Sequence, residues 1–130
     1  MGVYIATASQ NSAELLLKDL NRDVLAGLIP AWSIDALGDF THNSEKFGGK
    51  AFFRPAIRGS YIEMGLTWST NPKKSADATE IFAFYHGQMV EAILAYYGKR
   101  ILYLQPHPET ITSGDASIQG ILKKGFAGHV

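Results

Sequence analysis

The residues with the clearest chemical potential lie around one expected hairpin. Arg54 and Arg58 fall on one face of its first strand, and Tyr61 and Glu63 fall on the matching face of its second strand. Guanidinium groups can clamp a carboxylate or a phosphate, and a neighbouring glutamate can orient one of them. These four residues are therefore the candidate ligand-binding residues, for an anionic small molecule. The competing interpretation is that they form the ordinary polar face of a half-buried antiparallel sheet.

The histidines also have two competing interpretations. His86 lies within the apolar arc of an expected helix, where burial would suit either a general base or a neutral core residue with one hydrogen bond. Asp35, Asp39 and His42, with His86 or His107, contain the side chains that bind divalent ions. Their spacing matches no metal motif, and aspartates beside glycines are turn formers, so no metal ligand is predicted.

Motifs for catalysis are absent from the sequence. It has no Gly-x-Ser-x-Gly elbow, no phosphate-binding loop and no glycine-rich dinucleotide fingerprint. It also has no cysteine, which excludes thiolate nucleophiles, disulfides and cysteine-ligated metals. We therefore predict no catalytic residue and no cofactor, and the balance favours a protein that is not an enzyme.

Composition limits the partner classes. The 130 residues carry twelve basic and twelve acidic side chains, giving a net charge of zero, and such a surface does not attract nucleic acid or an anionic membrane. No apolar run approaches the ~20 residues of a membrane span, and the first residues do not resemble a signal peptide. We expect one soluble, cytoplasmic domain over residues 1–130, with residues 1–10 and 125–130 flexible.

Apolar periodicity predicts a helix in the first part of the chain. A capping box of Asn11 and Glu14 opens this helix and Pro30 stops it. A strand follows over residues 32–37, closed by Gly38 and Asp39, and residues 40–50 read as a loop.

The hairpin is the clearest local signal. Residues 51–58 and 61–68 alternate in polarity and are joined by Gly59-Ser60, which suits a type II′ turn. This turn fixes a register that runs from Arg58 opposite Tyr61 to Phe53 opposite Leu66. Pro55 cannot donate a hydrogen bond, so its strand should have a free edge there.

A second, long helix is expected from Asp77 to Tyr97, ended by Gly98. Its apolar residues cover more than half of its circumference, so it should be buried from more than one side. Gly87 indicates a close backbone approach to this helix. A strand over residues 100–105 follows, then a short strand at 110–112 and a weak helix at 116–124.

Together these elements predict an α+β fold with an antiparallel sheet of about four to five strands and two main helices on one face. A second copy of the chain should cover the long helix, giving a homodimer whose candidate interface residues are Leu15, Phe84, Tyr96 and Tyr97. The order of elements resembles that of small dimeric secretion chaperones and, more loosely, of bacteriophage tail-assembly proteins, although no residue motif carries the resemblance.

Three functions are compatible with these features. The first is a non-catalytic protein-interaction module, chaperone-like or adaptor-like, which acts as a small homo-oligomer and receives an extended peptide at the edge containing Pro55. The second is a domain that binds an anionic small molecule, or a small enzyme, through the four hairpin residues. The third is a phage or viral assembly subunit.

Overall fold

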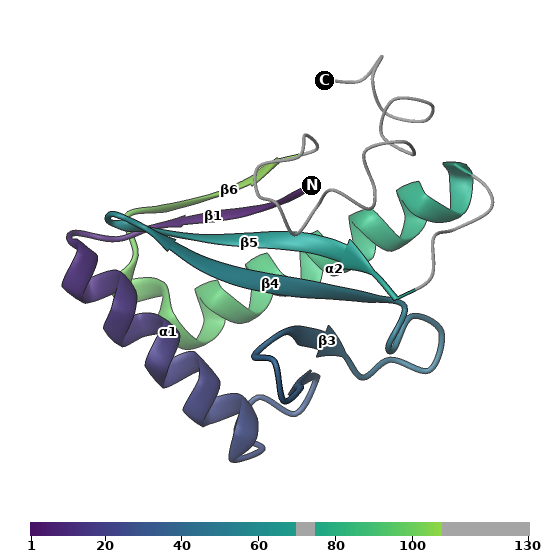
Figure 1. Ribbon diagram of the computed structural model, residues 1–130, viewed down its shortest axis with the longest axis horizontal. Coiled ribbons are helices and arrows are strands. Elements are labelled where there is room, and N and C mark those ends of the chain that lie inside the picture. The colour runs from purple at the N-terminus through teal and green to yellow at the C-terminus, as the bar shows by residue number, and fades with distance from the viewer. Residues whose placement is uncertain (70–74, 108–130) are drawn as a thin grey trace.

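A computed structural model describes residues 1–69 and 75–107. It is an α+β fold with a six-stranded antiparallel sheet in the order β2-β3-β4-β5-β1-β6 (Figure 1). The strands are β1 (Gly2–Ala6), β2 (Trp32–Ile34), β3 (Phe40–His42), β4 (Ala51–Arg58), β5 (Tyr61–Trp68) and β6 (Tyr103–His107). The helices are α1 (Gln10–Leu25), α2 (Ser75–Tyr97) and the short η1 (Gly98–Arg100). The predicted class is confirmed, with more strands than the four to five expected.

The N-terminal segment is the largest correction. Residues 1–10 are expected to be flexible, yet β1 lies inside the sheet, where it pairs with β5 on one side and β6 on the other. Val3 and Ile5 are fully buried. Their burial supplies the free energy that orders the segment, and it depends on strands that are distant in sequence. The expected flexibility of residues 125–130, and the elements expected at 110–112 and 116–124, lie outside the described residues.

The region between α1 and the hairpin also differs from expectation. The first strand ends at Ile34, and the segment expected to be a loop contains β3, which pairs with β2. Between them the Asp35 carboxylate accepts hydrogen bonds from the backbone N–H groups of Leu37 and Asp39. Gly38 has a φ of 85°, a conformation that a residue with a Cβ rarely adopts. The expected turn is therefore present, but it joins two short strands.

The hairpin matches its prediction at every position. β4 and β5 pair from Ala51 opposite Trp68 to Arg58 opposite Tyr61. Gly59 has a φ of 60°, as the first central position of a type II′ turn requires. In the described chain, only glycines have a positive φ. The turn therefore sets the register, and with it the face on which each side chain lies.

The edge predicted at the Pro55 strand is found only in part, because β4 lies between β3 and β5 in the sheet. Leu66 N–H donates to the Met1 carbonyl, so the even-numbered residues of β5 form their hydrogen bonds with β1 and the odd-numbered ones with β4. Met64 is opposite Pro55, and the proline nitrogen consequently faces away from β5. β3 pairs with β4 at Phe53 only, so in the described chain the missing N–H leaves no strand partner unsatisfied.

Helix α1 begins earlier than expected. Its N-cap is Ser9, whose hydroxyl accepts a hydrogen bond from Ser12 N–H, so the predicted capping box of Asn11 and Glu14 is wrong. The helix ends at Leu25, before Pro30, and Gly27 follows with a φ of 76°. The Ser9 hydroxyl satisfies a free backbone N–H at the start of the helix, as the Asn11 side chain is expected to do from the sequence. At the other end, Gly27 adopts the left-handed conformation that commonly terminates a helix.

Both helices cover the same face of the sheet, as predicted. In Figure 1, α2 crosses the strands and its end lies beside α1. One apolar cluster contains Leu16 of α1, Tyr85 of α2 and inward side chains of β1, β4 and β5, including Phe53. At the helix ends, the Tyr97 hydroxyl donates to Asp23 at 2.6 Å, which joins α2 to α1. The opposite face of the sheet is therefore left without a helix in the described chain.

Gly87 does not mark a close approach, so this expectation is wrong. The residue is exposed in the middle of α2, and a Cβ placed there would have no atom within 4 Å. Because glycine weakens a helix interior and nothing crowds the position, Gly87→Ala is expected to stabilise the protein by about 1 kcal/mol. Urea denaturation of the two proteins measures this gain. A loss of stability would show that an unseen contact requires the glycine.

Candidate functional site

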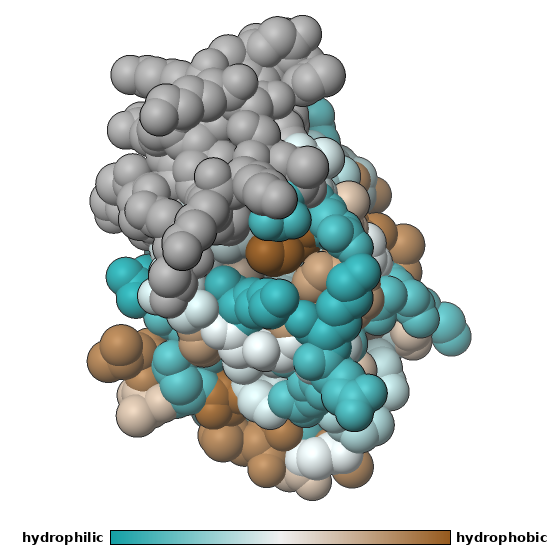
Figure 2. All heavy atoms as spheres, turned by 90° about the vertical axis from the view of Figure 1, so that its right-hand side faces the viewer, coloured by the Kyte–Doolittle hydropathy of each residue, from teal (hydrophilic) through white to brown (hydrophobic). Residues whose placement is uncertain are grey.

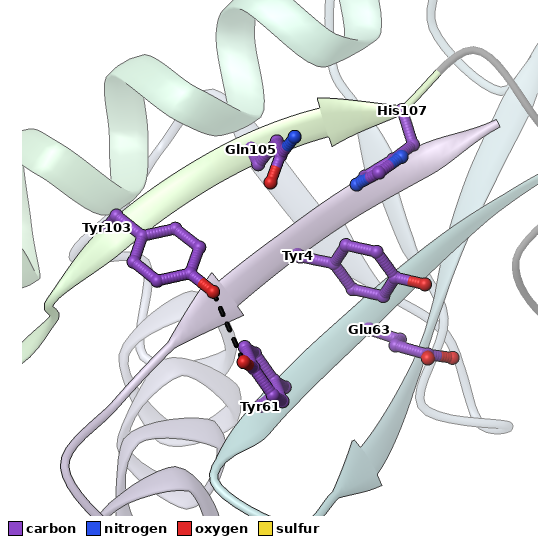
Figure 3. Close-up of a pocket in the computed structure, with 6 residues that line it drawn as sticks. All are labelled: Tyr4, Tyr61, Glu63, Tyr103, Gln105 and His107. Atoms are coloured by element: carbon purple, nitrogen blue, oxygen red, sulfur yellow. Dashed lines mark hydrogen bonds between the residues drawn. The ribbon is translucent and has the colours of Figure 1, made fainter.

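The candidate site is a pocket of about 360 Å³ on the outer face, which is the sheet face opposite the helices. Its lining side chains come from β1, β5 and β6 and are shown in Figure 3. They are Tyr4, Tyr61, Glu63, Tyr103, Gln105 and His107. We refer to this set as the tyrosine pocket.

The pairing of the strands explains why these side chains meet. Residues opposite each other in antiparallel strands share a face, and Ala6 lies between Tyr61 and Tyr103. In the next row, Tyr4 lies between Glu63 and Gln105. The pairing of β1 with β5 and β6 therefore brings the side chains of both rows onto one face.

The three tyrosine rings surround the hollow at different angles. The Tyr61 ring lies 6.2 Å from Tyr4 at an interplanar angle of 54°, and 6.4 Å from Tyr103 at 65°. In Figure 3 the rings of Tyr4 and Tyr103 are seen nearly face on, whereas Tyr61 is seen nearly edge on. The pocket therefore has two ring faces as its floor and a third ring as a wall.

Hydrogen bonds and ring contacts hold this arrangement. The Tyr103 hydroxyl donates to the Tyr61 hydroxyl at 3.2 Å, a bond that raises the pKa of the Tyr103 phenol. The His107 ring meets Tyr4 edge to face at 4.4 Å. Tyr61 and Tyr103 remain 39% and 47% exposed, so these rings are held in place while still open to a ligand.

The predicted anion clamp does not form as a free pair of cations. Arg54 makes a two-point contact with Asp39, with N–O distances of 2.8 and 3.2 Å. Arg58 contacts Glu63 through one N–O distance of 3.3 Å. The two arginines are also four strand residues apart, about 13 Å. Each guanidinium is paired with its own carboxylate.

His86 is a buried core residue, in agreement with the second of its two interpretations. Its Nδ1 lies 2.8 Å from the Phe82 carbonyl, and its ring is 5.4 Å from that of Phe53. Burial lowers its pKa from 6.5 to about 4. His42 is also buried, and burial likewise lowers its pKa. Neither imidazole lines the tyrosine pocket.

The residues considered as metal ligands each make a different interaction within the fold. Asp35 holds the turn before β3, Asp39 is bound to Arg54, and His42 Nδ1 accepts a hydrogen bond from Ser44 N–H. Within residues 1–69 and 75–107, no three histidine, aspartate or glutamate side chains are grouped to hold an ion. His107 lies in the tyrosine pocket instead.

The four candidate interface residues differ in how exposed they are. Leu15 and Tyr96 are 46% and 53% exposed. Phe84 is half-buried against Phe47, with ring centroids 4.6 Å apart, and Tyr97 is 5% exposed. The loop that carries Phe47 and the end of α1 therefore cover part of α2, so the chain itself shields much of the apolar arc that predicts a dimer.

A second hollow of about 250 Å³ lies beside α2. Trp32, Ala92 and Tyr96 are among its lining residues, and Tyr96 is 53% exposed. In Figure 2, hydrophobic residues gather at the lower edge of the face.

Sequence analysis identifies two of the six pocket residues, Tyr61 and Glu63. The other four lie on strands whose positions in the sheet depend on long-range pairing. One of these outward rows could have been found from the alternation of Tyr103, Gln105 and His107. From the sequence, however, that strand is expected to end at residue 105, whereas β6 continues to His107. Tyr4 lies in the segment expected to be flexible.

Comparison with protein-family models, with curated proteins and with solved structures finds no match to this chain. Neither long helix of the described chain, α1 nor α2, has the length and apolar character needed to cross a membrane.

Proposed function

We propose that this chain is a non-catalytic protein-interaction module that binds an extended peptide of a partner protein. The peptide would pair with β6 and place its side chains over the tyrosine pocket. The observation that carries this proposal is the position of three tyrosines on a sheet face next to the β6 edge. Within residues 1–69 and 75–107, that face carries no helix and β6 has only β1 as a strand partner. Tyrosine is enriched at protein interfaces because it combines a large apolar ring with a polar tip.

The hydrogen-bond pattern of β1 supports pairing at the β6 edge. Thr7 N–H donates to Ser60, so the odd-numbered residues of this segment bond toward β5 and its even-numbered residues bond toward β6. Their partners on β6 are Tyr103, Gln105 and His107, which leaves the backbone groups of Leu104 facing the open edge. An added strand can use that donor and acceptor, as in other β-augmented complexes.

The β6 edge is favoured over the β4 edge considered from the sequence. Both edges contain a proline, Pro106 and Pro55 respectively. Beside β4, however, the outward arginines Arg54 and Arg58 are already paired with carboxylates. Beside β6, the outward side chains form a hollow with exposed aromatic rings. A peptide gains contact area with these rings there.

Selection from a displayed random-peptide library tests this function. Peptides enriched on the full chain are expected to lose at least tenfold in affinity with Tyr61→Ala, measured by fluorescence anisotropy, because interface tyrosines commonly contribute more than about 1.4 kcal/mol. Tyr96→Ala is the matched control, since Tyr96 is also exposed but lies on α2. An equal loss with both variants, or a loss with Tyr96→Ala alone, would contradict binding at the outer face.

A homodimer is the second candidate, and it would use the helix side of the molecule. It is favoured by Tyr96, which lines the apolar hollow and is 53% exposed. Light scattering on the full chain is expected to give the mass of a dimer, and Tyr96→Glu is expected to reduce it to that of a monomer, because a buried unpaired charge is costly. A monomeric wild-type chain would exclude this candidate.

A further inference from the structure

We infer that the tyrosine pocket takes a cationic side chain, an arginine or a lysine, from the bound peptide. This inference rests on the proposed function and specifies what the pocket recognises. Aromatic faces attract cations through their negative quadrupole, and several rings around one hollow can act on the same cation.

The ring geometry fits a cation. The nearly face-on rings of Tyr4 and Tyr103 form a floor, and the nearly edge-on ring of Tyr61 forms a wall beside them (Figure 3). A cation within ~6 Å of a ring centroid interacts with that ring. With centroids 6.2 and 6.4 Å apart in the two neighbouring pairs, a group placed over the hollow reaches more than one ring. The volume of about 360 Å³ accommodates a guanidinium and its alkyl stem.

The charges at the pocket favour a cation over an anion. Glu63 is the acidic residue among the lining side chains, and it is only 8% exposed. Its partner Arg58 contacts it at a single long distance of 3.3 Å from the side of β4, does not line the pocket, and keeps 56% of its side chain exposed. Because Arg58 makes one contact and not a two-point pair, a ligand cation can compete for the carboxylate.

Because Arg58 competes for Glu63, substitutions of these two residues are expected to change the affinity for a cation in opposite directions. Arg58→Gln removes the competing cation and is expected to strengthen binding of a cationic group, whereas Glu63→Gln is expected to weaken it. An anion would respond in the opposite direction to Arg58→Gln. Loss of structure cannot imitate this pattern, because misfolding lowers affinity in every variant.

The probes are blocked arginine and blocked citrulline, each N-acetylated and closed as a methylamide. Citrulline has the same shape without the charge. Titration of the full chain, followed by the NMR signals of the tyrosine rings, is expected to show arginine binding about tenfold more tightly than citrulline. Tyr61→Ala and Glu63→Gln should each weaken arginine several-fold, Arg58→Gln should strengthen it, and Tyr96→Ala should leave it unchanged.

Three results would overturn the inference. These are equal affinities for arginine and citrulline, tighter binding of blocked glutamate, or weaker arginine binding in Arg58→Gln. If the selected peptides still depend on Tyr61 in any of these cases, the peptide-binding function stands and only its cationic preference fails. If peptide binding is also independent of Tyr61, both proposals fail.

Discussion

Phe53→Ala is expected to lower the free energy of unfolding by about 3 to 5 kcal/mol, the cost typical of truncating a buried phenylalanine. Phe53 is fully buried at the centre of β4. Its ring lies 6.0 Å from Trp32, 6.2 Å from Tyr85 and 5.4 Å from His86. These contacts join β2 and α2 to the hairpin, so the cavity left by truncation is lined from several elements that cannot close on it independently.

Phe52→Ala is the matched control for this prediction. Phe52 is the same residue type on the same strand, but it points to the other face and is only half-buried. Its truncation is expected to cost about 1 kcal/mol, a usual value for a partly exposed position. Urea denaturation of the three proteins gives both differences. Equal losses for the two variants would show that the helices do not pack on the face assigned to Phe53.

The same alternation explains which parts of the fold are predictable from sequence. The hairpin register follows from Gly59, because a two-residue turn leaves only one way to pair the strands. Helix α2 ends at Tyr97, directly before Gly98, as the local sequence predicts, and Gly98 begins the short η1. Each of these features depends on residues within a few positions of one another, and each is confirmed.

The elements that escape prediction depend on distant partners. β1 consists of five residues with no turn signal before them, and its order comes from pairing with strands about 60 and 100 positions later. β3 is three residues long, too short for a polarity pattern to stand out from a loop. Both errors therefore arise from long-range pairing, which local propensity does not encode.

The candidate site shows the same division. Tyr61 and Glu63 are placed on one face by the hairpin alone, and sequence analysis selects them together with the arginines. That face becomes a pocket only because β1 and β6 place Tyr4 and Tyr103 next to Tyr61 and Glu63. Without the position of these strands, the same residues indicate an anion clamp. With it, Arg54 and Arg58 become partners of acidic side chains.

Acidification is expected to destabilise the protein through His86. Its pKa is about 4 in the folded chain and 6.5 in an exposed peptide, because burial disfavours the charged imidazolium. The unfolded state therefore binds the proton more readily, so stability is fully present above pH 6.5 and falls as the pH decreases toward 4. Over that window the loss is about 3 kcal/mol, and it levels off below the folded pKa.

Two variants and one direct measurement test this pH dependence. His86→Gln cannot titrate, so its unfolding free energy should change much less between pH 6.5 and 4 than that of the wild type. His42→Gln should keep most of the change, since it retains His86, although burial lowers the pKa of His42 in the same direction. NMR titration of the His86 ring in the wild-type chain provides the pKa without any substitution. An imidazole that titrates near 6.5, or a wild-type stability that is constant across this window, would contradict burial of His86 as the neutral form between Phe82 and Phe53.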